Sequence, residues 1–284
     1  MKVIEKINEM QEIAGSLRKK GNTIAVIPTM GYLHDGHCSL IRHGKEIADA
    51  VITTLFVNPT QFAPNEDFEK YPRDFERDFK LAEATGSDFL FHPSTEEMYP
   101  ENFNSELKIS GITEKFEGKF RPAHFNGVAT VVAKLFNATL PDYAIFGQKD
   151  YQQTLVIKKL VKEFNFPIKI IVAPTMRETD GLAMSSRNVY LSPDERQKAT
   201  ILYKALCEGK KAIENGELNR INLNNILSDT LLTVRGIVID YAAAADAETL
   251  DEPDVFNPNQ SIVLQIACKI GKTRLIDNMM VLKE

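Results

Sequence analysis

The sequence predicts an α/β protein, with a doubly wound, Rossmann-like parallel sheet in an N-terminal domain and a smaller α+β C-terminal domain. In the first half of the 284-residue chain, short apolar runs of strand length alternate with helical patterns. This alternation is typical of a parallel sheet covered by helices. In the second half, helical patterns come first and strand patterns follow, which is typical of an α+β domain. We expect the two domains to span residues 1–175 and 176–284.

The first elements are expected to be a helix, a strand and a second helix. Residues 1–21 repeat apolar side chains on one helical face and end on a glycine. The apolar run 24–27 has the length of a buried strand and is expected to break at Pro28 and Gly31. Apolar spacing of about three to four residues between positions 40 and 48 then predicts a helix. The chain is therefore expected to open with a helix, which a strand–turn–helix unit follows.

The alternation continues through the rest of the first domain. The β-branched run 51–57 is typical of a strand covered on both faces, and a polar loop follows through Asn65. After that loop, the expected order is a helix near 75–82, a strand at 89–91, an irregular stretch over 99–127, a helix at 128–136, a strand at 143–146, a helix at 155–161 and a strand at 168–172.

The second domain is expected to begin with helices. Residues 192–195 read Ser-Pro-Asp-Glu, a capping box with proline at the first helical position, and should open a long helix through about residue 213. A second helix over 222–234 should precede strands at 236–243, 262–270 and 273–276, which we expect to be antiparallel.

Composition and net charge argue against several classes of protein. The net charge of -5 and pI of about 5.7 argue against nucleic acid as a partner, which requires a basic face. No apolar run approaches the ~20 residues that span a bilayer, and the first residues lack the apolar segment of a secretion signal. Cys38, Cys207 and Cys268 are odd in number and far apart, which fits reduced thiols rather than disulfides or a zinc cluster. We expect a cytoplasmic enzyme without a membrane partner.

The turn between the first strand and the following helix is the strongest functional indication. It carries His34, Asp35, Gly36 and His37. At the start of a helix, backbone N–H groups and the helix dipole favour an anion, and a glycine lets a ligand approach the backbone. This pattern suggests a nucleotide site.

Polar motifs also follow other expected strands. In a parallel sheet ligands bind outside the carboxyl ends of the strands, so these motifs should face one crevice. They are residues 58–62 after the second strand, 147–150 with Gln153 in the next helix, and 184–188 just after the change of domain.

Each motif also has a purely structural interpretation. His34 and His37 could be structural histidines or a pair of metal ligands, although no further cluster has zinc-ligand spacing. Lys149 with Asp150 could be a solvated turn, and residues 184–187 an ordinary polar loop. The functional interpretation depends on all the motifs lying where an α/β enzyme binds its ligand.

Taken jointly, the side chains suit a polyphosphate. Imidazoles, a lysine, an arginine and serine hydroxyls donate charge-assisted hydrogen bonds to the charge that grows in phosphoryl transfer. The chain has no Walker glycine–lysine loop, and its histidines suit attack at the α-phosphate with pyrophosphate leaving. Gln61 and Gln153 suit the hydroxyl and carboxylate of a small substrate.

The chain contains, in this order, the motifs PTMGYLHDGH, FVNPTQF, YPRD, RPAHFNGV, FGQKDYQQ, DGLAMSSRN and KTRLIDN. In these motifs it resembles, nearly end to end, the pantothenate synthetases (pantoate–β-alanine ligases). The pair His-x-Gly-His and Met-Ser-Ser-Arg is more distantly similar to the nucleotidyltransferase superfamily. The resemblance implies that pantoate and ATP form pantoyl adenylate and pyrophosphate, and that β-alanine then attacks the acyl carbon to give pantothenate and AMP. It also implies Mg²⁺ with ATP, and a homodimer.

The same resemblance implies roles for single residues. His37 would be the catalytic general acid, with His34, Lys149 and Arg187 on the phosphates, while Asp150 would lie near the ribose. The ATP-binding residues would be Met30, Gly31, Tyr32, Leu33, His34, Asp35, Gly36, His37, Gly147, Gln148, Lys149, Asp150, Met176 through its backbone, Met184, Ser185, Ser186 and Arg187. Pantoate would be held by Gln61 and Gln153, with Arg121 as a further anion contact. The metal ligands are not predicted.

Three positions depart from the family pattern. Ala123 and Asn126 stand where the family often has Gly and Arg, and Gln148 stands where Glu is common. Other hypotheses compatible with the motifs are an adenylyltransferase that releases no AMP, a nucleotide-binding regulator without turnover, and a metal-dependent hydrolase that uses His34 and His37 as ligands.

Overall fold

The computed structural model describes residues 1–64 and 66–281 and divides the chain into two compact units. Unit 1 comprises Met1–Glu114, Arg121–Gln148 and Gln152–Pro174. Unit 2 comprises Lys115–Phe120, Lys149–Tyr151 and Thr175–Glu284. The units are therefore interleaved in sequence, and two short segments of the expected first domain, together with its last residue Thr175, belong to unit 2. Asn65, at which the expected polar loop ends, and residues 282–284 of the expected second domain lie outside the described residues.

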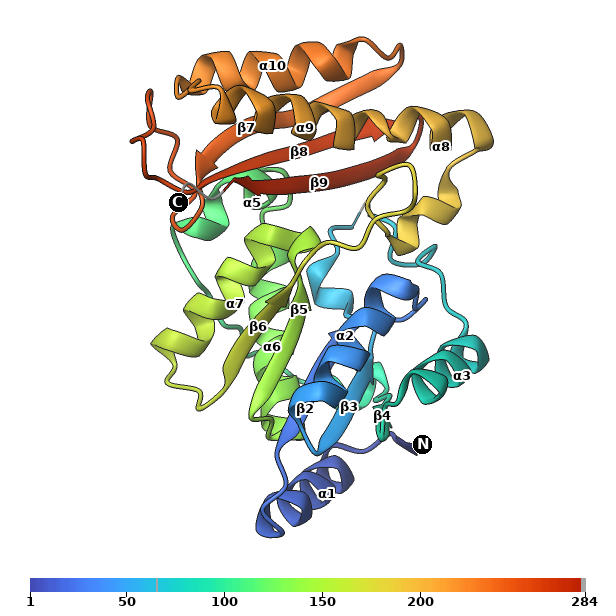
Figure 1. Cartoon of the computed structure of the whole chain (residues 1–284). Helices are drawn as coiled ribbons and strands as arrows, with labels where there is room; N and C mark the ends of the chain where they lie inside the picture. The colour runs from blue at the N-terminus through green and yellow to red at the C-terminus, as the bar shows by residue number, and fades with distance from the viewer. Residues whose placement is uncertain (65, 282–284) are drawn as a thin grey trace. The chain divides into compact units, whose positions relative to one another are not determined.

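Unit 1 is built on a six-stranded sheet in which all neighbouring strands are parallel, in the order β1-β4-β3-β2-β5-β6 (Figure 1). The strand order reverses between β2 and β5, which is the switch point of a doubly wound fold. The predicted fold of the N-terminal part is thus confirmed. The strands are β1 (Lys2–Ile4), β2 (Ile24–Thr29), β3 (Ala50–Leu55), β4 (Phe89–Phe91), β5 (Tyr143–Gly147) and β6 (Lys169–Ala173).

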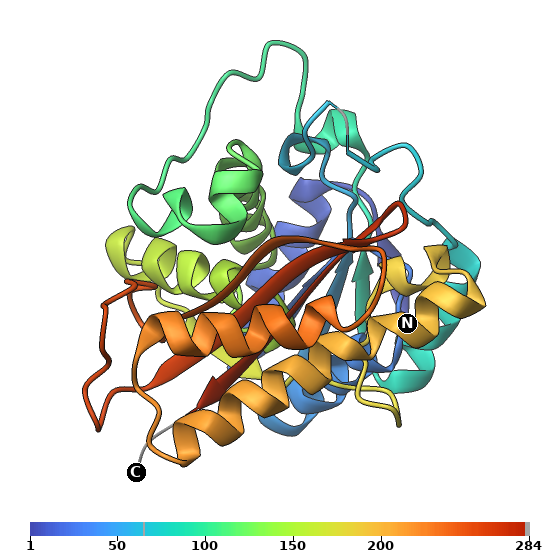
Figure 2. The same ribbon diagram turned by 90° about the horizontal axis from the view of Figure 1, so that it is seen from above.

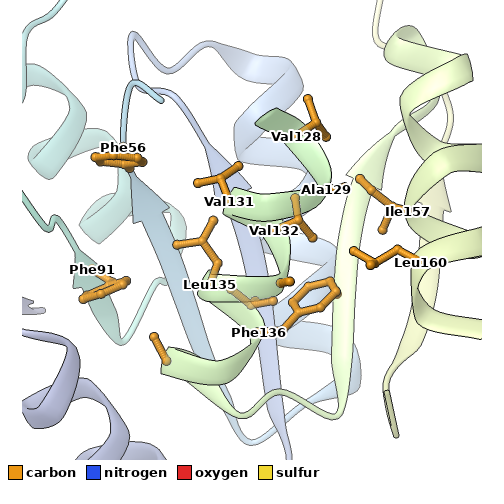
Figure 3. Close-up of a cluster of buried hydrophobic side chains, with 14 of the residues drawn as sticks. Phe56, Phe91, Val128, Ala129, Val131, Val132, Leu135, Phe136, Ile157 and Leu160 are labelled. Carbon is orange, nitrogen blue, oxygen red and sulfur yellow. The ribbon is translucent and has the colours of Figure 1, made fainter. Parts of the chain in front are cut away.

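Helices cover both faces of this sheet because each carries an apolar stripe. On one face a core forms between the strands and helices α1, α6 and α7, and on the other face α2 and α3 pack against the strands. Figure 3 shows the first core gathered along α6, with Phe56 and Phe91 on one side and Ile157 and Leu160 of α7 on the other. The helices are α1 (Ile7–Lys19), α2 (Asp35–Ile47), α3 (Phe75–Thr85), α4 (Thr95–Met98), α6 (His124–Thr139) and α7 (Tyr151–Glu163).

Unit 2 contains an antiparallel sheet in the order β7-β8-β9, with helices packed on it (Figure 2). Its core joins buried side chains of α9 and α10 to those of β8 and β9. The predicted α+β class of this part is confirmed. The elements are α5 (Phe116–Phe120), α8 (Pro193–Ala199), α9 (Ile201–Glu214), α10 (Arg220–Leu232), β7 (Ile237–Asp246), β8 (Ile262–Ile270) and β9 (Thr273–Val281).

Two expectations for the N-terminal part were wrong. Residues 1–21 are not one helix, because Lys2–Ile4 pair in register with Phe89–Phe91 and become an edge strand. β2 also does not break at Pro28. The register of β2 with β5 ends at Val26, so the proline lies where β2 pairs with β3 alone.

Other boundaries also differ. The stretch 99–127, expected to be irregular, contains α5 and the start of α6. The predicted capping box is present, since Ser192 and Glu195 bond each other's backbone N–H. The helix it opens is interrupted at Thr200, whose hydroxyl donates to the Gln197 carbonyl at 2.9 Å. The last strand continues to Val281 rather than ending at residue 276.

Over residues 1–64 and 66–281, no helix combines the length and hydropathy that crossing a membrane requires.

Candidate active site

The turn after β2 has an unusual backbone. Gly31 and Tyr32 both adopt left-handed conformations, with φ of +87° and +51°. At Gly31 the positive φ strains any other residue, and a Cβ atom would also lie 2.9 Å from Cδ1 of Leu55, which would have to shift. The Gly31 N–H donates to Oγ1 of Thr29 at 3.2 Å, and that hydroxyl donates to the Thr54 carbonyl at 2.6 Å. The chain therefore reverses tightly at the carboxyl end of β2 while remaining tied to β3.

A buried carboxylate on α3 fixes this turn. Oδ2 of Asp78 accepts the Tyr32 N–H at 2.6 Å, and Oδ1 accepts the Leu33 N–H at 2.7 Å. Burial raises the pKa of Asp78, although these two backbone hydrogen bonds and the charge of Arg77 oppose the rise. The guanidinium of Arg77 also lies 4.8 Å from the centre of the Tyr32 ring. Asp78 is thus part of the site's support, and no local sequence pattern indicates this because its partner Tyr32 is 46 residues away.

The two histidines form the start of α2. His34 is the N-cap and His37 the third helical residue, and each side chain bonds the other's backbone N–H. The His34 N–H lies 3.3 Å from Nδ1 of His37, and the two ring centres are 4.0 Å apart. Because Nδ1 accepts this hydrogen bond, a neutral His37 carries its proton on Nε2. The capping geometry therefore assigns Nε2–H of His37 as a donor.

Gln61 lies beside this turn, at the end of a 3₁₀ turn (Pro59–Gln61). Its amide donates to Sδ of Met30, and its Oε1 lies 3.3 Å from Nδ2 of Asn58. Asn58 also donates to the Gly127 carbonyl at 3.1 Å, so α6 comes close to the 3₁₀ turn. A Cβ on Gly127 would overlap the carbonyl of Thr60. The structure thus brings Gln61 together with the predicted nucleotide turn through Met30.

Arg121 binds both the backbone carbonyl of Gln61 and the carboxylate of Glu66. Its guanidinium forms two hydrogen bonds to Glu66, at 2.7 and 2.6 Å, and a third to the Gln61 carbonyl at 3.2 Å. Burial alone would raise the pKa of Glu66, but the hydrogen bonds and charge of Arg121 hold that pKa below its usual value. Nδ1 of His124 also donates to the Gln61 carbonyl, at 2.9 Å. The structure therefore pairs Arg121 with an acid, and its predicted contact with a substrate anion stays a prediction.

A cavity of about 420 Å³ adjoins the turn in unit 1. Met30, Gly31 and Asp78 form part of its wall, and the rest mixes apolar, polar and charged residues. This volume is large enough for a small molecule. The other lining residues are Glu5, Lys6, Leu55, Phe56, Val57, Phe68, Arg73, Asp74, Phe75, His92, Pro93, Ser94 and Thr95.

The predicted motif at 147–150 spans the boundary of the units. Gly147 ends β5 in unit 1, whereas Lys149 and Asp150 belong to unit 2. The carbonyl of Lys149 accepts Nδ2 of Asn278 at 2.8 Å, and Nζ of Lys149 lies 3.9 Å from Asp150. The lysine is thus held through its backbone by β9. Gln148 lies in the 3₁₀ turn that precedes α7, and Gln153 is half-buried on that helix.

The remaining predicted nucleotide residues of unit 2 lie on one hairpin and on the 3₁₀ helix that follows it. The Met184 N–H donates to the Met176 carbonyl at 3.0 Å, which brings the two motifs together. Ser185 caps the next 3₁₀ helix (Ser186–Tyr190) by accepting the Arg187 N–H at 3.2 Å, and Ser186 is buried. These contacts set the backbone that carries Arg187.

No group of three or more His, Cys, Asp or Glu residues suited to a metal ion occurs among the residues that the structure describes. Cys38 is fully buried even though it follows His37 directly. The three cysteines are free thiols, and burial raises the pKa of Cys268 to about 12.

Comparison with known proteins finds the same family along nearly the whole chain. The family model described as pantoate-beta-alanine ligase matches residues 2–280. Pantothenate synthetases from Acetivibrio thermocellus and Caldicellulosiruptor bescii are 49% and 50% identical over 281 residues, which cover 99% of each chain.

Solved structures give the same result. Pantothenate synthetase from Thermus thermophilus superposes with a TM-score of 0.92 at 40% identity, covering 98% of this chain and 99% of that one. Pantoate-beta-alanine ligase from Francisella tularensis, complexed with beta-gamma ATP and beta-alanine, has a TM-score of 0.81 at 37% identity, covering 99% and 97%. The chain belongs to the pantoate–β-alanine ligase family.

Proposed function

We propose that this chain condenses pantoate with β-alanine to pantothenate, through a pantoyl adenylate, and releases pyrophosphate and AMP from ATP. The observation that carries the proposal is the family match over residues 2–280 together with the half-buried histidine turn inside that match. The Francisella tularensis relative, solved with beta-gamma ATP and beta-alanine, supports ATP and β-alanine as substrates. The product belongs to pantothenate biosynthesis.

In the first step, a carboxylate oxygen of pantoate attacks the α-phosphorus of ATP and pyrophosphate leaves. We assign His37 to this step because its backbone contact with His34 places the ring proton on Nε2. An N–H donor that is already oriented stabilises the negative charge that develops in the transition state. His34 would contact the phosphates beside it.

Lys149, Arg187 and the serines at 185 and 186 would bind the polyphosphate of ATP. Hydrogen bonds from cationic groups to phosphate oxygens are short and strong, and both serines carry a hydroxyl donor. The carbonyl of Met176 already accepts an N–H from Met184, so the hairpin backbone is fixed where adenine would contact it. Asp150 would bind the ribose.

Mg²⁺ would accompany the nucleotide. It takes oxygen ligands, keeps several waters and is commonly held by substrate phosphates rather than by a protein cage. Residues 1–64 and 66–281 hold no cluster of three acids or histidines placed for a metal, so this donor set fits a cation that the phosphates carry. The ion would neutralise charge on the phosphates.

Gln61 and Gln153 would hold pantoate. The Gln61 side chain is nearly buried and lies between Met30 and Asn58, and its carbonyl accepts bonds from Arg121 and His124. This support would keep the amide oriented toward an acid. In the second step, the β-alanine amine attacks the acyl carbon and AMP leaves. Holding both reactants at one site can contribute as much as about 7–11 kcal/mol.

We further propose that the enzyme is a cytoplasmic homodimer. Three free thiols are consistent with a reducing compartment, and the homodimer follows from the resemblance to the family.

Mass spectrometry of the products tests the proposed reaction. The purified chain is incubated with ATP, Mg²⁺, pantoate and β-alanine, and omission of each acid in turn is the control. We expect equal amounts of pantothenate and AMP, and only with all components present. A product that retains the adenylyl group would identify an adenylyltransferase instead, and ATP binding without any product would identify a regulator.

A further inference from the structure

The middle of β9 carries two buried polar residues, Asp277 and Asn278, for which the proposed reaction gives no role. Both residues are 3% exposed. Both oxygens of the Asp277 carboxylate accept from the guanidinium of Arg177, at 2.6 and 3.0 Å. The Asn278 N–H donates to the same carboxylate at 2.8 Å. The two residues therefore form one hydrogen-bonded group in the middle of this strand.

This group fixes the hairpin that carries Met176 and Met184. Arg177 follows Met176 directly and bridges to Ala183, next to Met184. Its guanidinium also donates to the Gly181 carbonyl at 3.0 Å and lies 4.3 Å from the centre of the Tyr203 ring. The base of the hairpin thus depends on Arg177, and Arg177 depends on Asp277.

The same group fixes Lys149. Nδ2 of Asn278 donates to the Lys149 carbonyl at 2.8 Å, while the Asn278 carbonyl accepts from Arg177 at 3.2 Å. One dipeptide in β9 therefore contacts two segments, 149–151 and 175–184, that are well separated in sequence. Both segments carry proposed ATP ligands.

Stability alone does not account for this arrangement. A buried ion pair loses the hydration of two charges, and apolar residues of the same volume often stabilise a core as well or better. Such pairs do impose a defined geometry, because a carboxylate and a guanidinium meet in one plane. The geometry imposed here is the spacing between Lys149 and the hairpin.

We propose that Asp277 and Asn278 are positioning residues for ATP, which set the backbone of Lys149 and of the Met176–Met184 hairpin without touching the nucleotide. This inference rests on the proposed function only in assigning ATP to those segments. Its test therefore measures nucleotide binding directly by isothermal titration calorimetry, with turnover measured separately.

The first test uses a double-mutant cycle. We expect Asn278→Ala to weaken ATP binding about tenfold, a factor typical for the loss of one buried hydrogen bond. In a Lys149→Ala background the same substitution should weaken ATP binding less than about twofold, because the side chain that Asn278 positions is gone. An equal loss in both backgrounds would contradict the proposal, since a general loss of structure acts without regard to Lys149.

The second test uses Asp277→Asn with Asp240→Asn as the matched control. Asp240 in β7 also pairs with an arginine of β9, Arg274, at 2.6 Å, but touches neither nucleotide segment. We expect Asp277→Asn to raise the KM for ATP about tenfold with the pantoate KM unchanged, and Asp240→Asn to change neither. Thermal unfolding confirms that each variant is folded.

A parallel rise in both KM values for Asp277→Asn, or an equal rise in the ATP KM for Asp240→Asn, would overturn the assignment. If the wild-type chain makes no pantothenate but the calorimetric cycle behaves as expected, the proposed reaction fails and the positioning role stands.

Discussion

Oδ2 of Asp78 accepts the backbone N–H of Tyr32 at 2.6 Å, and together with the Leu33 N–H that Oδ1 accepts, this contact joins α3 to the turn on which the proposed chemistry depends. Tyr32 has a positive φ, a conformation that costs a non-glycine residue free energy unless its surroundings enforce it. The carboxylate provides that enforcement. Asp78 is 1% exposed, and both of its oxygens accept backbone N–H groups of the turn.

Asp78→Asn should disturb the turn. The carboxylate has two acceptor oxygens, whereas an asparagine side chain has one oxygen and one NH₂ donor. One buried backbone N–H of the turn therefore loses its acceptor, which lowers the free energy of unfolding by about 1–3 kcal/mol. We expect a lower unfolding free energy in urea and a lower kcat. Asn219→Ala is the control, because Asn219 caps α10 by accepting the Asn222 N–H at 3.1 Å and does not line the cavity beside the turn. It should cost about 1 kcal/mol of stability and leave kcat unchanged. Equal kcat for both variants would show that the turn does not need Asp78.

His37→Ala should slow adenylate formation by about 10²–10³ while ATP binding changes little, since the lost Nε2–H donor acts on charge that develops in the transition state. Rapid-quench measurement of pyrophosphate gives the rate. His43→Ala tests specificity, because His43 lies on the same helix and faces Glu46 at 3.2 Å in an exposed position. A single-turnover rate near wild type for His37→Ala would refute the assigned role.

Gly127→Ala should impair pantoate binding without touching any proposed ligand. The added methyl would overlap the Thr60 carbonyl and push the 3₁₀ turn that ends at Gln61, and overpacking of this kind typically costs about 1–3 kcal/mol. We expect a lower melting temperature and a pantoate KM that rises more than the ATP KM. Gly15→Ala, on α1 with open space around the new methyl, should instead stabilise by about 0.5–1 kcal/mol. Unchanged pantoate kinetics in Gly127→Ala would contradict this reading of the turn.

The Glu66–Arg121 pair should make stability depend on pH in the acid range. Arg121 holds the pKa of folded Glu66 below its unfolded value, which is about 4.3. The pair's contribution is therefore present above that unfolded pKa and is lost as pH falls through the lower, folded pKa. We expect Glu66→Gln to melt at a lower temperature than wild type above about pH 5, with the difference shrinking below about pH 4. A difference in melting temperature between the two proteins that stays constant from about pH 3 to 7 would contradict a lowered pKa for folded Glu66.

Much of the fold could be predicted because the signals are local. The β-branched run at 51–57 predicted β3, and Ser192 with Glu195 predicted the start of α8. Other features depend on partners far along the chain. Lys2–Ile4 form a strand only because Phe89–Phe91 offer an open edge, and no local pattern in three residues indicates that pairing.

In the candidate site, too, some residues could be predicted from local sequence and others could not. The motifs around His37 and Lys149 stand out in the sequence, and their assigned roles stay predictions. The side chains that hold them do not stand out, because their partners are distant: Asp78 is 46 residues from Tyr32, and Asn278 is 129 residues from Lys149. Sequence patterns point to groups that carry charge or hydrogen-bond donors, whereas the supports of such groups depend on tertiary packing.

The most direct test of the central claim is a two-stage turnover experiment. Enzyme in excess over ATP, with Mg²⁺ and pantoate, should release one equivalent of pyrophosphate in a burst and retain the adenylate. Adding β-alanine should then release AMP together with pantothenate. Pyrophosphate that appears only after β-alanine is added, or AMP that appears with pantoate alone, would contradict a two-step mechanism through a bound pantoyl adenylate.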